Sequence, residues 1–361
     1  MTVLYAGVIV AFFFAMNIGA SGAAASMGVA YGAGAVRKPV VALLISGLGV
    51  FLGAALGGGE VVKTIGSGIV PGSIMTIKIA LVVLSSACLS LFIANLLGIP
   101  LSTSEVTVGA VVGAGVAYQG EAVAWSKMGT ILLFWILIPG IAFLLALVVG
   151  KGIQWAKSRL PSLDAPHIRR PLAWLLVLAG FMEAYSAGMN NVANAVGPLV
   201  GAKVLSVSDG ILYGGMFVAL GALLLGRRAL ETNGKRITDI SLLEGSAISG
   251  TGAGLVIGAS MLGIPVPLTQ ITSSAIIGIG TAKQGFTYRQ KNVIAQMMKV
   301  WVVSPVFSLV IAYALVKIFI QGDFYTVLVL VSVLVATAGS ISLMRSVQRE
   351  RRSFHEHGDG I

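Results

Sequence analysis

Charged residues are scarce in this sequence. Asp, Glu, Lys and Arg make up 10% of its 361 residues, against roughly 25% in an ordinary soluble domain. Hydrophobic residues make up 57%, and the mean hydropathy is +0.95. A soluble protein cannot bury so much apolar surface, because even large domains leave much of their surface to water. The composition therefore predicts an all-α, multi-pass protein of the cell membrane.

Long stretches contain no Asp, Glu, Lys or Arg at all. They are residues 1–36, 39–59, 79–104, 128–150, 184–202, 245–282 and 324–344. A spanning helix needs about 20 mostly apolar residues, so several stretches can hold one span and the longest can hold two. We therefore expect about 10–12 transmembrane spans.

Residues typical of metal sites and catalysis are also missing from the apolar stretches. A single cysteine, Cys88, excludes an internal disulfide. The histidines lie in the central polar segment and the tail, and the aspartates lie in or beside polar connections. There is no His cluster for a metal, no Asp pair for an intramembrane protease, no HExxH motif and no Walker loop. We expect no cofactor, no bound metal and no enzymatic activity.

The net charge of +11 favours positive-inside membrane topology over nucleic-acid binding, because the bases cluster beside apolar runs. The clearest cluster is KGIQWAKSRLPSLDAPHIRR at 151–170, which we interpret as a cytoplasmic linker. A final span at 321–344 then returns a basic tail at 345–361 to the cytoplasm.

The sequence on either side of the linker repeats itself. Three blocks align: 19–28 with 188–197, 63–66 with 231–234, and 98–100 with 263–265. Their offsets are nearly constant, at 169 (188 − 19), 168 (234 − 66) and 165 (263 − 98) residues. We interpret 1–150 and 171–320 as two membrane repeats, inverted if each has an odd number of spans. Transporters built this way bind substrate between their repeats.

Four segments break the apolar pattern at equivalent places in the two repeats. Those at 17–28 and 188–198 are rich in Gly, Ser or Asn, and those at 99–109 and 264–274 have Pro followed by hydroxyls. Gly removes the Cβ obstacle to tight turns, and Pro removes a helix hydrogen bond. We therefore expect broken or re-entrant helices that meet near the midplane. A restarting helix offers free N–H groups and a positive dipole end, which favour an anion.

Side chains in these segments add neutral hydrogen-bond donors suited to a tetrahedral oxyanion. The predicted substrate-binding residues are Ser21, Gly22, Ser26, Ser102, Thr103, Ser104, Asn190, Asn191, Asn194, Thr269, Thr272 and Ser273. The alternative is that small residues merely allow close helix packing. Four paired clusters at equivalent positions favour the binding site.

Two acidic residues, Glu105 and Glu183, stand deep in the apolar pattern. Glu183 lies 12 residues beyond Pro171 (183 − 171), or about 18 Å along a helix. An ionised side chain is costly at that depth, so we predict that both residues couple ion movement to transport. The alternative is a carboxylate satisfied by a helix N-terminus, or by Lys78 or Lys203.

The duplicated motifs resemble those of the PiT family of inorganic phosphate transporters. That family carries a GAND-V-A-N-type signature in each half, followed by a P-V-S-T-T-H-type segment. Here GMNNVANAVGPL (188–199) keeps most of the signature, and KTIGSGI (63–69) and RRALETNGKRIT (227–238) also look like the family. The resemblance extends from about residue 8 to residue 317 and implies a secondary transporter.

The departures from the family pattern concern its charged residues. The family's Asn and Asp fall on Ser21 and Gly22 in the first half, and its second-half Asp falls on Asn191. Its His falls on Glu105 and Gln270. The resemblance therefore does not carry over the cation-binding aspartates. The positions that match or nearly match its ligands are Asn190, Asn194, Ser102, Thr103, Ser104 and Thr269.

These losses indicate a change of substrate. Sulfate carries no proton near neutral pH, so a carboxylate repels it, whereas Ser, Asn and backbone N–H groups donate to it. The first repeat, AMNIGASGAAASMG (15–28), resembles the bacterial sulfate permeases of the family. We expect a sulfate importer that thiosulfate and related oxyanions inhibit, with phosphate as the alternative substrate.

Import of a dianion into a cell with a negative interior costs about 2.3 kcal/mol per charge per 100 mV, so a cation must accompany it. We expect proton symport, with Glu105 as the better candidate because it adjoins the hydroxyl cluster. The partners are then the lipid bilayer, the oxyanion and the proton, without nucleic acid, and assembly as a homodimer stays open. An intramembrane enzyme or a channel-like scaffold is the alternative class.

Overall fold

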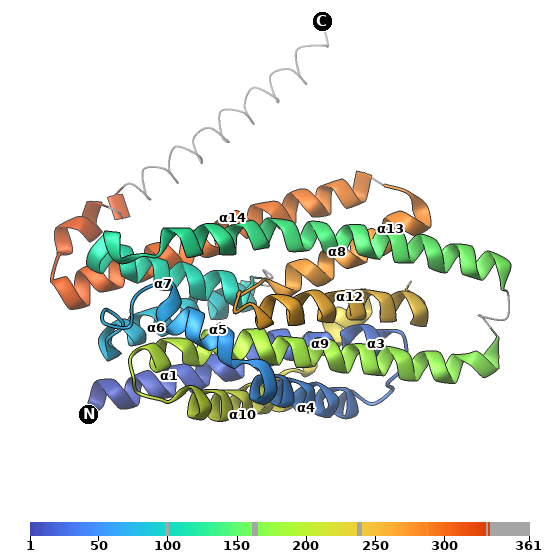
Figure 1. The fold of residues 1–361 in the computed structure, drawn as a ribbon, viewed down its shortest axis with the longest axis horizontal. Helices are drawn as coiled ribbons and strands as arrows, with labels where there is room; N and C mark the ends of the chain where they lie inside the picture. Colours follow the sequence, from blue (N-terminus) through green and yellow to red (C-terminus); the bar gives the residue numbers. More distant parts are fainter. Residues whose placement is uncertain (98–100, 161–164, 237–239, 287, 330, 333–361) are drawn as a thin grey trace, which may run out of the picture. The chain divides into compact units, whose positions relative to one another are not determined.

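The computed structural model describes residues 1–97, 101–160, 165–236, 240–286, 288–329 and 331–332. The chain divides into two units, Met1–Tyr313 and Ala314–Ile361. All regular elements of the described residues are helices (Figure 1).

The first half of the chain forms five longer helices, joined by short helical turns. They are α1 (Thr2–Ile18), the π-helical turn η1 (Gly19–Ala23), α2 (Ala24–Ser26), α3 (Gly28–Gly32), α4 (Pro39–Gly57), α5 (Gly59–Lys63), η2 (Thr64–Gly68), α6 (Ile77–Leu97), α7 (Thr103–Gln119), η3 (Gly120–Ala122) and α8 (Trp125–Arg159). In this half α1 packs against α6, and α6 packs against α7.

The second half has a similar series of helices, except that one continuous helix, α9, stands where the first half has α1 and the short elements after it. It contains α9 (Pro166–Gly201), α10 (Val207–Leu225), α11 (Arg227–Arg236), α12 (Leu242–Met261), α13 (Leu268–Gln284), α14 (Tyr288–Val316) and η5 (Lys317–Gln321). Helix α9 packs against both α4 and α12, and α13 packs against α8. The two halves are therefore interleaved and do not form separate bundles.

Eight of the described helices are long and apolar enough to cross a membrane. Helices α7 and α13, with 17 residues each, reach about 26 Å, somewhat less than a hydrocarbon core of about 30 Å. A total of ten or more spans therefore depends on these two helices and on residues outside the described ranges. The final span expected at 321–344 lies largely outside those ranges, and the tail at 345–361 lies wholly outside them.

The outer helices expose side chains that a soluble protein would bury. Ile136 and Val148 on α8 are 71% and 67% exposed, and Leu224 on α10 is 68% exposed. Lipid acyl chains solvate such residues favourably, so these surfaces face the bilayer.

Glycines bring helices of the two halves into backbone contact. A Cβ at Gly19 would lie 1.9 Å from the carbonyl oxygen of Val218 on α10. A Cβ at Gly188 would lie 2.0 Å from the carbonyl oxygen of Val50 on α4. Gly19 and Gly188 are aligned in the first sequence block, and the two valines are 168 residues apart (218 − 50). Each half thus places its first long helix against the second long helix of the other half.

The second sequence block also corresponds to a pair of close backbone contacts between the two halves. A Cβ at Gly32 would lie 2.4 Å from the carbonyl oxygen of Gly234, and one at Gly201 would lie 2.0 Å from that of Gly66. Gly66 and Gly234 are aligned in this block, and Gly32 and Gly201 are 169 residues apart (201 − 32). The offset found in the sequence therefore relates pairs of contacts in space.

Of the four segments predicted to break a helix, some are interrupted in the structure and one is not. Segment 17–28 contains the π-helical turn η1 and a break at Met27, and segment 264–274 begins with a non-helical stretch before α13. Segment 99–109 begins partly outside the described residues, and α7 begins at Thr103.

The break expected at 188–198 is wrong, because α9 continues through it to Gly201. Asn residues weaken a helix when their side chains bond to their own backbone. Here Asn190, Asn191 and Asn194 bond instead to residues of other segments.

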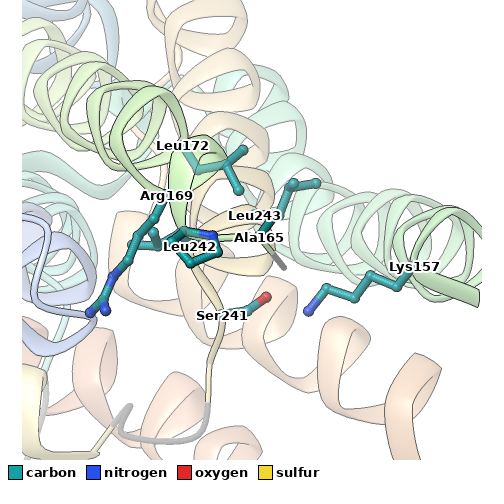
Figure 2. Close-up of a pocket in the computed structure, with 8 residues that line it drawn as sticks. Lys157, Ala165, Arg169, Leu172, Ser241, Leu242 and Leu243 are labelled. Carbon is teal, nitrogen blue, oxygen red and sulfur yellow. The ribbon is translucent and has the colours of Figure 1, made fainter. Parts of the chain in front are cut away.

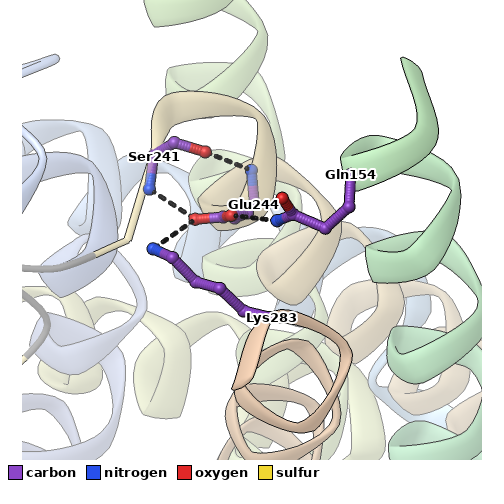
Figure 3. Close-up of polar contacts among 4 residues, drawn as sticks. All are labelled: Gln154, Ser241, Glu244 and Lys283. Carbon is purple, nitrogen blue, oxygen red and sulfur yellow. Dashed lines mark hydrogen bonds and ion pairs between the residues drawn. The ribbon is translucent and has the colours of Figure 1, made fainter. Parts of the chain in front are cut away.

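A buried acid joins three helices where α12 begins (Figure 3). Glu244 is 1% exposed and completes a capping box with Ser241, whose N–H donates to Oε2 at 2.8 Å. Gln154 of α8 donates to Oε1 at 3.0 Å, and Lys283 Nζ of α13 lies 3.9 Å from Oε2. These partners offset the cost of burying the carboxylate.

The segment expected as a linker, 151–170, is helical at both ends. Helix α8 continues to Arg159, and α9 begins at Pro166, with Pro in the first turn, where its missing N–H costs no hydrogen bond. Residues 161–164 lie outside the described ranges.

Candidate functional site

Buried polar side chains gather where the middle of α9 meets the start of α7 and the stretch before α13. The Asn190 amide is at the centre. Its Oδ1 accepts hydrogen bonds from Val266 N at 3.1 Å and from Ser104 Oγ at 3.2 Å. Its Nδ2 donates to Ser260 Oγ at 2.9 Å and to the carbonyl of Ile264 at 3.2 Å. These bonds use both hydrogens and both lone pairs of the amide, so Asn190 fixes the non-helical stretch against α9.

One helical turn further along α9, Asn194 faces the start of α7. Its Nδ2 lies 3.4 Å from Thr103 Oγ1 and 3.4 Å from Ser104 Oγ, which is longer than the usual N–H···O range. Its Oδ1 is buried without a partner among the described residues. Thr103 donates to Asn191 Oδ1 at 3.2 Å. Because both contacts of Asn194 Nδ2 are long, this nitrogen is the donor that a ligand can engage at the lowest cost.

Asn191 and Gly22 meet at the π-helical turn η1. A Cβ at Gly22 would lie 3.8 Å from Asn191 Nδ2, and in the described part of the chain nothing accepts a hydrogen bond from this nitrogen. The two residues are aligned by the internal repeat, 169 positions apart (191 − 22). Residues with equivalent positions lie next to each other only where the two halves meet.

Glu105 and Gln270 form a second pair of aligned residues, 165 positions apart (270 − 105). Both are buried, and Gln270 Nε2 donates a hydrogen bond to Glu105 Oε1. Ser304 of α14 lies beside the carboxylate. Because Glu105 follows Ser104 directly, this acid adjoins the network around Asn190.

Glu183 is buried two turns before Asn190, on the same face of α9. Thr272 Oγ1 donates to Glu183 Oε1 at 2.7 Å, and Ser249 of α12 also lies beside it. The position aligned with Glu183 in the first half is Phe14, which is fully buried. This acidic position therefore belongs to one half alone.

The remaining predicted residues lie at the edge of the network or outside it. Ser21 donates to a carbonyl of its own helix at 3.0 Å, and Ser26 has a buried hydroxyl without a partner among the described residues. Ser102 caps α7. Thr269 is exposed and Ser273 is half-buried.

A pocket of about 290 Å³ opens between the end of α8 and the starts of α9 and α12 (Figure 2). Lys157, Arg169 and Ser241 line it together with apolar residues. None of the predicted substrate-binding residues lines it. Within the described ranges, no group of three or more His, Cys, Asp or Glu residues could hold a metal ion.

Comparison with known proteins identifies the family of this chain. The model of the phosphate transporter family matches residues 18–312. The chain belongs to the phosphate transporter (PiT) family. It is therefore a multi-pass membrane transporter, as the motif resemblance predicted.

Two relatives within the PiT family extend over most of the chain. The sulfate permease CysP of Bacillus subtilis is 57% identical over 356 residues, which are 99% of both chains. A candidate phosphate permease of Pyrococcus abyssi is 30% identical, with 85% of this chain and 96% of that protein covered.

A solved structure has the same fold. The structure of the sodium-dependent phosphate transporter matches with a TM-score of 0.79 and 24% identity, and the match covers 88% of this chain and 99% of that chain. The two proteins therefore share their helix arrangement.

Three hydroxyls of the candidate site were not predicted from the sequence: Ser249, Ser260 and Ser304. Each is a single serine in an apolar helix outside the repeated motifs, where close helix packing explains it equally well. For the Glu105–Gln270 pair the sequence did hold a signal, because the repeat alignment places these two residues at equivalent positions.

Proposed function

We propose that this transporter imports sulfate, with phosphate as the alternative substrate. One observation carries the proposal: Gly22 and Asn191, which stand where the family pattern has Asp, face each other across the two halves with neutral groups. Sulfate accepts hydrogen bonds and donates none, so neutral donors suit it and carboxylates repel it. The name of the relative with 57% identity, sulfate permease, supports the same substrate.

The anion would bind between two inverted repeats, next to Gly22 and Asn191. Thr103, Ser104 and Asn194 are the adjoining donors whose hydrogen bonds are long or shared. Asn190 has no hydrogen left to donate, so its role is to hold the site in shape. The exchanged glycine contacts support the inverted arrangement, since they recur at the sequence offset.

Proton symport would supply the energy. A sulfate dianion needs accompanying positive charge to enter against the membrane potential. Glu105 adjoins Ser104 and has Gln270 as its hydrogen-bond partner, so it can bind or release a proton beside the anion. Glu183, with Thr272, is the second acid able to do this.

Uptake of radiolabelled sulfate into proteoliposomes tests the substrate. We expect an inward proton gradient to drive uptake, unlabelled thiosulfate to inhibit it, and phosphate to compete poorly. Strong inhibition by phosphate at near-equal concentration would reverse the order of the two substrates.

The Glu105→Gln variant tests the coupling. We expect it to abolish the dependence on the pH gradient while exchange of sulfate for sulfate continues, because Gln cannot bind a proton. Glu60→Gln, at an exposed position paired with Lys63, serves as the control and should behave as wild type. Uptake driven by a sodium gradient alone, without pH dependence, would contradict proton symport.

A further inference from the structure

A second pocket, of about 370 Å³, lies between α4 and α9. The segment that leads into α4 contributes Arg37 and Lys38, and the first turns of α9 contribute Arg170 and Trp174. The rest of the lining is aliphatic or alanine. This pocket is distinct from the oxyanion site, because none of its lining residues belongs to the four motif segments.

The three bases of this pocket have no acidic partner among the residues that the structure describes. Arg37, Lys38 and Arg170 are exposed, and none of them forms an ion pair with an acid in the described ranges. No acidic residue is among the described residues that line the pocket. Three cations together in one concave surface attract an anion with several acceptor oxygens.

The apolar part of the lining decides which anion fits. Val41 and Trp174 are 40% and 72% exposed, and Val177 continues the same wall along α9. A free oxyanion gains nothing from such a wall, whereas a phospholipid places its phosphate among the bases and its glycerol and acyl chains along the apolar residues. Trp is also the residue that favours the boundary between headgroups and acyl chains.

The pocket lies at the end of the helices that carries the basic segment 151–170, since α9 begins there. By the positive-inside rule this end faces the cytoplasm. Anionic phospholipids of the cytoplasmic leaflet attract juxtamembrane bases, and basic pockets between helices on this side bind their headgroups.

We propose that this pocket binds an anionic phospholipid, with the phosphate held by Arg37, Lys38 and Arg170 and the acyl chains lying along the seam between α4 and α9. The two helices come from different halves of the chain. Further along the same seam, a Cβ at Gly49 would lie 2.9 Å from the Ala184 side chain. A lipid bound at the end of this seam contacts one helix from each half of the chain.

Trp174 is a built-in reporter for the test. The purified full-length protein is reconstituted with phosphatidylglycerol or phosphatidylcholine whose acyl chains are brominated, and the quenching of tryptophan fluorescence is measured. The same measurement on Trp174→Phe isolates the Trp174 signal from the other tryptophans. We expect brominated phosphatidylglycerol to quench Trp174 at several-fold lower mole fraction than brominated phosphatidylcholine does.

Variants that lack one or more bases test whether this pocket causes the preference for phosphatidylglycerol. One base near an anionic surface changes affinity about fivefold, so Arg170→Gln should lower the preference for phosphatidylglycerol about fivefold. The triple variant Arg37→Gln, Lys38→Gln, Arg170→Gln should abolish it. A matched control, Lys151→Gln, Arg159→Gln, Arg228→Gln, removes the same charge from three exposed bases outside the pocket and should keep it.

Three results would overturn the proposal. Equal quenching by the two lipids in wild type would mean that no anionic lipid is selected. Equal loss in the control triple variant would mean that general surface charge is responsible. Loss of the preference on adding sulfate, but not sodium chloride at the same ionic strength, would identify a site for free oxyanions.

Discussion

Gly19 in the first half and Gly188 in the second make the same kind of backbone contact, yet the residues two and three positions further on differ in kind. The first half has Ser21 and Gly22, whereas the second has Asn190 and Asn191. The close helix contacts are shared between the halves, while the amides at these aligned positions belong to the second half alone. A duplicated framework can therefore stay symmetric in packing and become asymmetric in chemistry.

The asymmetry extends to charge. Glu183 in the second half lies opposite Thr272, whereas the equivalent positions of the first half hold Phe14 and Thr107. Thr107 has a buried hydroxyl with no partner among the described residues. The second half thus contributes amides and a carboxyl at positions where the first half has none.

The largest effect is expected at the shared contacts. Gly188→Ala and Gly19→Ala each place a Cβ about 2 Å from a backbone carbonyl oxygen, and a backbone atom cannot rotate away as a side chain can. We expect both variants to lose folded protein to a similar extent, beyond the usual overpacking cost of about 1–3 kcal/mol. Size-exclusion chromatography of detergent extracts measures this.

Gly254→Ala is the control for these two variants, because nothing lies within 4 Å of its added Cβ. A fully folded Gly19→Ala variant beside an unfolded Gly188→Ala variant would break the proposed equivalence of the two contacts.

The next largest effect is a difference in stability between variants of Asn190 and of its aligned residue, Ser21. Asn190→Ala removes the partner of three buried groups, the N–H of Val266, the hydroxyl of Ser260 and the carbonyl of Ile264. We therefore expect a loss of roughly 3–5 kcal/mol in the free energy of unfolding. Ser21→Ala removes one bond within a helix and should cost less than about 1 kcal/mol. Denaturant unfolding in detergent measures both, and equal losses would contradict the difference between the halves.

Ser104→Ala and Asn194→Ala should act on transport more than on stability. Loss of one hydrogen bond to a charged group costs about 1.5–3 kcal/mol, or roughly ten- to a hundredfold in sulfate affinity. The half-maximal concentration for sulfate uptake measures this. Unchanged uptake in both variants would remove these residues from the substrate site.

The smallest effect compares the two aligned threonines. Thr272→Val removes the hydrogen bond to Glu183 and should destabilise the protein by about 1 kcal/mol. Thr107→Val removes an unpartnered hydroxyl and should be neutral or slightly stabilising. Thermal unfolding midpoints of the two variants measure this difference, and a matching fall in both would contradict it.

Composition, repeats and motifs could predict the membrane fold and the family, because these depend on local sequence. The continuous α9 could not be predicted, since an Asn-rich stretch stays helical only when distant groups occupy its amides. The hydrogen bonds that occupy the Asn190 amide nitrogen depend on Ser260 and Ile264, which are 70 and 74 residues away. Only contacts between aligned residues, such as Glu105 with Gln270, were accessible through the duplication.

The glycine contacts between α1 and α10, and between α4 and α9, also bear on how the transporter moves. Helices that interlock through large side chains must leave one set of holes before they enter the next. Where backbone lies on backbone, that barrier is low, so one helix can slide along its neighbour as a shear motion. Two such surfaces lie at aligned positions of the two halves, so both pairs of helices could slide in the same way.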